Sequence, residues 1–147
     1  MLFVSILAII ISLYLLNLHY SDSGSFCDIS ASLSCDIVNK SAYSVFPPGW
    51  GIPVSLMGAI TWLVVIIVLL MIKNNKSFNI GKTKFDKYIF SDFLFYLMIL
   101  SLLFALYLVY TELFLILSIC ILCLVLDIII LTMLFLTWRL KAMIYGN

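Results

Sequence analysis

Four long apolar stretches dominate this sequence and limit what the chain can fold into. A helix needs about 20 consecutive, predominantly apolar residues to cross the hydrocarbon core of a bilayer. The stretches that meet this requirement cover residues 2–18, 53–72, 89–110 and 114–138. Only 10% of the residues are charged, whereas an average soluble domain has about 25%. We therefore predict an all-α integral membrane protein, a four-transmembrane-helix bundle that forms one domain over residues 1–147.

The first stretch could also be a secretory signal peptide. No Lys or Arg precedes it, however, and no small-x-small cleavage pattern follows it. Its apolar run is also longer than the core of a typical signal peptide. We therefore expect this stretch to remain in the protein as its first span.

The charged residues between the spans predict how the chain lies in the membrane. Five of the eight Lys and Arg residues fall in the loop over residues 73–88, and Arg139 and Lys141 follow the fourth span. The loop over residues 19–52 contains three Asp residues and one Lys. Because basic loops remain cytoplasmic, we expect a multi-pass protein of the plasma or inner membrane with both termini in the cytoplasm and the 19–52 loop outside. The charge pattern indicates no nucleic-acid partner.

The connections between the spans add two expectations. Only Thr111 and Glu112 stand out as polar between the third and fourth stretches, which predicts an antiparallel hairpin with a tight outward turn there. The 19–52 loop is far longer than a usual connection, and such loops are generally functional or disordered. Short helical pieces are expected near residues 35–43, where apolar residues recur at helical spacing.

Four cysteines form two pairs in the outward half of the predicted bundle. Cys27 and Cys35 lie in the outer loop, and Cys120 and Cys123 form a CxxC motif within the fourth stretch. On a helix the two CxxC positions share a face, one turn apart. This spacing allows a reversible disulfide or half of a metal site. Cys120 is expected about five or six residues below the outer end of its helix, roughly 9 Å deep.

Simpler interpretations of the cysteines remain open. A buried Cys packs like a small hydrophobic residue, and the loop pair could be a structural staple. Zinc is disfavoured because a structural site needs four Cys or His ligands and His19 is the only histidine, so we predict no metal. The combination of a loop pair in an oxidising compartment and a nearby membrane-embedded pair favours a redox relay.

In order and spacing, these motifs resemble the vitamin K epoxide reductase family in its short bacterial or archaeal form. The resemblance covers nearly the whole chain. Its matching positions are, in chain order, Cys27-Asp28, Cys35, Ser41, Gly51-Ile52-Pro53-Val54, Gly58 and the CxxC of Cys120 and Cys123. Val54 departs from the Asn by which vertebrate members bind vitamin K. This departure favours reaction with a simple quinone over epoxide reduction.

The resemblance implies a membrane thiol-disulfide oxidoreductase that supports disulfide bond formation. A reduced, secreted or periplasmic thioredoxin-fold protein would attack Cys27 of the loop disulfide. Cys35 would then attack Cys120, and Cys123 would deliver electrons to a membrane quinone of the ubiquinone, menaquinone or vitamin K type. The lipid bilayer and a membrane quinone would thus be partners of the chain, together with the thioredoxin-fold protein.

Three further residues are candidates for quinone binding or proton transfer. Asp127 lies near the middle of the fourth stretch, where a charged residue costs about 2.5–3.5 kcal/mol on insertion scales. It also lies on nearly the same helical face as Cys120, so it is either a proton carrier beside the quinone or a carboxyl satisfied by a neighbouring Ser or Thr. The resemblance favours a role for Ser41 at the quinone headgroup and for Asp28 beside the first loop cysteine. The family often has Tyr at the position of Asp127.

Two other classes of function compete with the enzyme. The intramembrane carboxyl of Asp127 is also compatible with a transport subunit whose thiols are incidental. A structural membrane subunit, stapled by the loop disulfide, is the second. Within the redox class, reduction of a vitamin K quinone or epoxide is the alternative to thiol oxidation. A relay would cycle between oxidised and reduced cysteines, whereas a staple would stay oxidised.

Overall fold

The computed structural model describes residues 1–21, 24–28, 30, 33–46, 51–74, 78–80, 83–85 and 87–146. Its elements are, in chain order, α1 (Leu2–Tyr20), α2 (Cys35–Asn39), the 3-10 helix η1 (Ala42–Ser44), α3 (Val54–Lys73), β1 (Phe78–Ile80), β2 (Thr83–Phe85), α4 (Lys87–Thr111), the π-helical turn η2 (Glu112–Ile116) and α5 (Ile121–Tyr145). The expected short helical pieces near residues 35–43 are thus present as α2 and η1.

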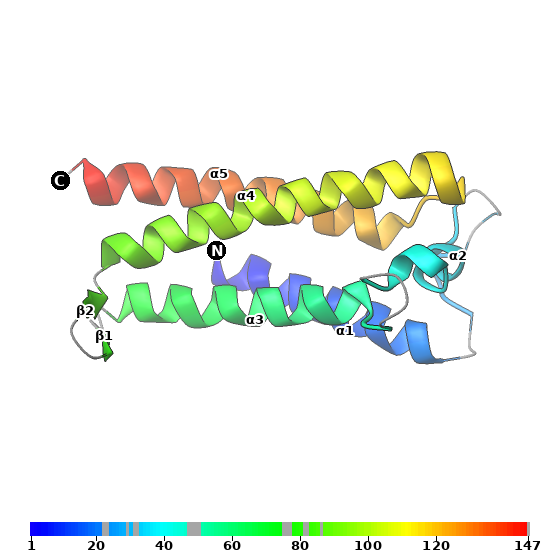
Figure 1. Cartoon of the computed structure of the whole chain (residues 1–147), viewed down its shortest axis with the longest axis horizontal. Coiled ribbons are helices and arrows are strands. Elements are labelled where there is room, and N and C mark those ends of the chain that lie inside the picture. The colour runs from blue at the N-terminus through cyan, green and yellow to red at the C-terminus, as the bar shows by residue number, and fades with distance from the viewer. Residues whose placement is uncertain are drawn as a thin grey trace.

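Four helical segments in the described part of the chain are long and apolar enough to cross a membrane: Leu2–Tyr20, Val54–Lys73, Tyr88–Ile116 and Ile121–Tyr145. This confirms the predicted four-helix membrane bundle. Figure 1 shows the long helices side by side, with α2 and the α4–α5 connection at one end and the β1–β2 hairpin and the C-terminus at the other. The 73–88 connection, expected as a linker, contains this hairpin, in which Phe78 pairs with Phe85.

The bundle is built from two tightly packed helix pairs, α1 with α3 and α4 with α5. The central core contains Trp62 and Val65 of α3 together with Met98 of α4 and Met133 of α5. Small residues allow α1 and α3 to approach closely, as is common between membrane helices. A Cβ atom added at Gly58 would lie 3.5 Å from the Ser12 hydroxyl. The α3–α4 contact is looser than either pair.

The predicted boundary between the third and fourth spans is wrong. No turn lies at Thr111–Glu112, because α4 continues to Thr111 and η2 extends the helical path to Ile116. The chain reverses over residues 117–120, and α5 begins at Ile121. Leu117 makes the reversal in a left-handed conformation, with φ of 56°, which costs a non-glycine residue about 1–2 kcal/mol. The apolar sequence on both sides gives no signal for a turn at this point.

Candidate functional site

The outer loop is held on the end of the bundle by α2. Ser34 caps this short helix, because its hydroxyl oxygen accepts a hydrogen bond from the Ile37 N–H at 3.1 Å. At the other end of α2, the Asn39 side chain donates to the carbonyl oxygen of Leu15 at 2.5 Å. His19 Nδ1 lies 2.7 Å from the carbonyl oxygen of Asn39 and donates to it. These contacts fix α2 against the outer end of α1.

Cys27 and Cys35 form a disulfide across the start of α2, with a Cα–Cα separation of 5.8 Å. Cys27 is 4% exposed and Cys35 is fully buried. The segment before Cys27 is tied to α2, because the Ser25 N–H donates to the Asp36 carboxylate at 3.2 Å. The outer disulfide is therefore packed under the loop surface, and its exchange with another protein requires the segment to lift.

The CxxC motif begins at the helix end and not inside the helix. Cys120 is the N-cap of α5, and its sulfur accepts a hydrogen bond from the Cys123 N–H at 3.3 Å. The expected depth of five or six residues is therefore wrong, because the span starts seven residues later than the hydropathy pattern suggested. A hydrogen bond from the Cys123 side chain is the main cause that lowers the pKa of Cys120, and the backbone N–H acts in the same direction.

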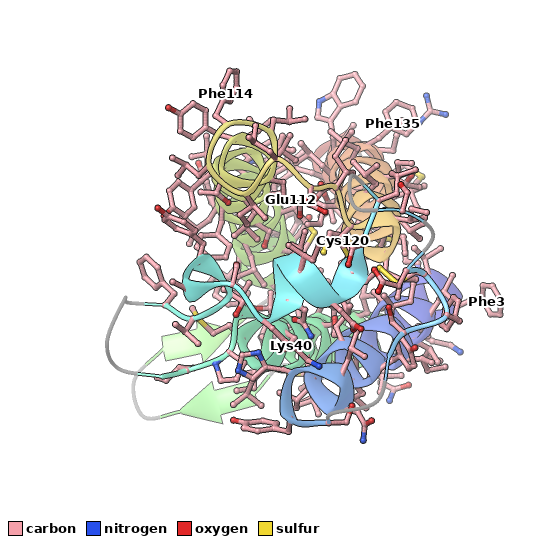
Figure 2. All side chains as sticks on the ribbon, turned by 90° about the vertical axis from the view of Figure 1, so that its right-hand side faces the viewer. Phe3, Lys40, Glu112, Phe114, Cys120 and Phe135 are labelled. Carbon is pink, nitrogen blue, oxygen red and sulfur yellow. A yellow bond between two sulfur atoms is a disulfide. The ribbon has the colours of Figure 1, made fainter. Side chains whose placement is uncertain are left out.

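The two cysteine pairs meet at this end of the bundle. Cys27, Cys35 and Cys120 belong to one buried apolar cluster with Leu15 and Leu18 of α1, and Cys123 packs against it. Leu33 of the loop also forms a parallel bridge with Ile119, the residue before Cys120. Figure 2 looks onto this end and shows Cys120 beside α2, with its neighbour Glu112. The outer disulfide and the inner dithiol are thus neighbours in a dry environment.

A cavity of ≈ 370 Å³ lies beneath α2, between the helices. Its walls include the predicted residues Ser41, Cys123 and Asp127, whereas Cys120 does not line it. Most of the lining surface is apolar, as in typical small-molecule pockets. Two lining residues, Met57 of α3 and Leu100 of α4, are also exposed on the outer surface of the bundle, so the cavity reaches the face that lipid would cover.

The structure separates the three candidate residues for quinone binding or proton transfer. Ser41 and Asp127 line the same cavity as Cys123. Asp127 follows Cys123 by four residues on α5, so the two side chains share a helical face. It lies in the outer third of α5 and not near its middle. Asp28 is exposed on the loop and does not line the cavity.

Sequence reasoning missed Glu112, which it placed in an outward turn. Glu112 is only 5% exposed, and its Oε2 accepts a hydrogen bond from the backbone N–H of Cys120 at 3.2 Å. It also lines the cavity, as Cys123 does, and the two side chains interact electrostatically. The available signal was an acidic residue two helical turns before a CxxC inside an otherwise apolar run.

Among the described residues, no group of three or more His, Cys, Asp or Glu side chains is placed to hold a metal ion. The sequence model of the vitamin K epoxide reductase family matches residues 1–138 of the chain. None of the curated proteins compared with the chain matches it.

Proposed function

The chain belongs to the vitamin K epoxide reductase family, and from this premise we propose that it passes electrons from protein thiols to a membrane quinone. Membership makes the chain a multi-pass membrane oxidoreductase. The proposed donor is a reduced thioredoxin-fold protein outside the membrane. The reaction oxidises this donor, which can then introduce disulfide bonds into other proteins. The observation that carries the proposal is the single buried cluster shared by the outer disulfide and Cys120.

Electrons enter at the outer pair. A thiolate of the donor attacks the Cys27 sulfur, the Cys27–Cys35 bond breaks, and Cys35 leaves as a thiolate. The donor's second thiol then attacks the mixed disulfide, which releases Cys27 and the oxidised donor. Phe26 is 75% exposed beside the buried Cys27, so it offers the donor an apolar contact where the loop must open.

The inner pair receives the electrons by the same chemistry. The Cys35 thiolate attacks Cys120 in a Cys120–Cys123 disulfide, and Cys123 leaves with the electron pair of the broken bond. Cys27 then attacks Cys35, which closes the outer disulfide again and frees Cys120. The outer pair is oxidised and the inner pair is a free dithiol in this structure.

The cavity beside Cys123 fits a quinone headgroup in its chemistry. Its mostly apolar wall suits the ring, and the Ser41 hydroxyl and the Cys123 thiol offer polar contacts to ring oxygens. When bound, a quinone supplies a two-electron, two-proton acceptor for the dithiol. Val54 also lines the cavity and has no hydrogen-bonding side chain, which favours a simple quinone over an epoxide. Ubiquinone, menaquinone and vitamin K quinones share this chemistry.

The proposed topology follows from the charges and from the shared end of the cysteine pairs. The 19–52 loop, α2 and the 117–120 reversal lie outside the cytoplasm, and both termini lie inside. The β1–β2 hairpin, at the opposite end of the bundle (Figure 1), is then cytoplasmic. This arrangement gives the donor protein access to Cys27 and gives the quinone access from the bilayer.

A trapping experiment tests the proposed function. Replacing Cys35 with Ala leaves Cys27 unable to expel its partner, so we expect a stable mixed disulfide with a secreted thioredoxin-fold protein. The matched control replaces both Cys27 and Cys35 with Ala and should trap nothing. In parallel, the native chain should reduce a short-chain quinone when supplied with dithiothreitol. The absence of both the adduct and quinone reduction refutes the enzyme and favours a stapled structural or transport subunit.

A further inference from the structure

We propose that Glu112 is the proton acceptor for the Cys120/Cys123 dithiol when this pair is reoxidised. The inference rests on the proposed function, since it assigns a catalytic residue to the same reaction. The sequence predicted an outward turn at Glu112, and its position beside the CxxC emerges only from the way η2 extends α4 past that expected turn. Figure 2 shows Glu112 directed toward Cys120 at the end of the bundle.

The contacts of Glu112 suit a base for this dithiol. The Cys120 N–H donates to Oε2 at 3.2 Å, which orients the carboxylate and leaves its other oxygen available. The Cys123 side chain interacts electrostatically with the same carboxyl, and both residues line the cavity. Glu112 thus contacts one CxxC residue through its backbone N–H, and it lines the same cavity as the other, Cys123, whose sulfur is a reacting atom.

The surroundings leave few other proton carriers. The described lining of the cavity contains no Lys, Arg or His. Its titratable groups are Tyr43 on η1, Glu112 on η2, and Cys123 and Asp127 on α5. From α2, Cys35 is held in the disulfide and the Asp36 carboxylate faces the Ser25 N–H. Glu112 is the carboxyl that also contacts Cys120.

The reaction balances with Glu112 in this role. Oxidation of the dithiol to a disulfide releases two electrons and two protons, and reduction of one quinone to a quinol consumes both. Glu112 takes a proton from the Cys123 thiol and thereby produces the thiolate that gives up its electrons. The resulting carboxylic acid then donates this proton to a reduced ring oxygen. The second proton comes from the Cys120 thiol as the sulfur–sulfur bond forms, and Asp127, the other carboxyl that lines the cavity, carries it to the second ring oxygen.

Glu112→Gln tests the assignment, because the amide keeps an oxygen for the Cys120 N–H but cannot accept a proton. The pre-reduced full chain is mixed with a short-chain benzoquinone, and quinone absorbance is followed in a single turnover. We expect the rate at pH 6.5 to fall by about 100-fold, within the usual range for losing a general base. The deficit should narrow toward pH 9, where hydroxide increasingly ionises the thiol without help.

Asp92→Asn is the matched control, since this carboxyl lies on α4 outside the cavity, and it should keep the native rate. A Glu112→Gln rate equal to the native rate, or a deficit that is constant across pH, overturns the base role. If Glu112→Gln does not fold, Glu112→Asp decides: its retracted carboxylate should slow the turnover, and an unchanged rate and pH profile overturn the proposal. A native chain that reduces no quinone refutes the proposed function itself.

Discussion

Replacing Cys27 and Cys123 with Ala leaves Cys35 and Cys120 as the only thiols of the chain, and we expect these two to form a disulfide under mild oxidation. Both side chains are fully buried in the same apolar cluster. A disulfide requires Cα atoms within about 7 Å. The crosslink therefore measures whether the outer loop can bring its second sulfur onto the start of α5.

The stabilisation expected from the crosslink follows from the length of the loop that each disulfide closes. A Cys35–Cys120 bond closes roughly 85 residues, which corresponds to about 4.6 kcal/mol of chain entropy at 25 °C. The native outer disulfide has a sequence separation of 8 and corresponds to about 2.5 kcal/mol by the same relation. The crosslinked variant should thus be about 2 kcal/mol more stable than the native chain, which raises the melting temperature by roughly 4–8 °C.

Proteolysis with mass spectrometry detects the crosslink, and tryptophan fluorescence in detergent follows the thermal transition with and without reductant. The matched control replaces Cys27 and Cys120, so that only Cys35 and Cys123 remain. Because Cys123 lines the cavity, this control should crosslink more slowly. Equal crosslinking of the two variants contradicts the assigned order of transfer, and the absence of any Cys35–Cys120 crosslink refutes the relay.

Three further predictions concern the loop, the bundle and the inner thiols. Asn39→Ala removes the buried hydrogen bond from α2 to the Leu15 carbonyl of α1. Because this carbonyl keeps its bond within the helix, the loss should cost about 0.5–1.5 kcal/mol, and limited proteolysis should cut the loop sooner. Gly58→Leu crowds the Ser12 hydroxyl and should destabilise the bundle by about 1–3 kcal/mol in a thermal melt. The lowered pKa of Cys120 means that its thiolate persists to lower pH than an ordinary thiol. Cys123→Ala removes the main cause of this lowering. The pH profile of Cys120 modification by a small thiosulfonate, which forms a mixed disulfide with the thiolate, should therefore shift upward, and an unchanged profile contradicts this.

Hydropathy could predict the spans because each is a nearly uninterrupted apolar run, and no knowledge of packing is needed to recognise a membrane helix. It could not predict where the third span ends. Thr111 and Glu112 are the polar residues of that region, and sequence reasoning assigns polar residues to turns. In the structure both are buried, whereas the reversal is made by Leu117 without Gly or Pro.

The candidate site could be predicted where it depends on the spacing of the cysteines along the sequence. The CxxC and the loop pair are visible as motifs, and the resemblance supplied their order. The role of Glu112 depends on a π-helical extension that turns its carboxyl toward Cys120, and such a local geometry has no sequence periodicity. The exposure of Asp28, next to the buried Cys27, likewise depends on how the loop folds onto the bundle.

The placement of the cavity bears on how the protein can be blocked. α2 covers it from the loop side, while Met57 and Leu100 connect its wall to the outer surface between α3 and α4. A competitor for this space must dissolve among acyl chains before it can bind. Its potency should therefore increase with its lipid partition coefficient. The potency should also depend on the amount of detergent or vesicle in the assay as much as on the total concentration of the competitor.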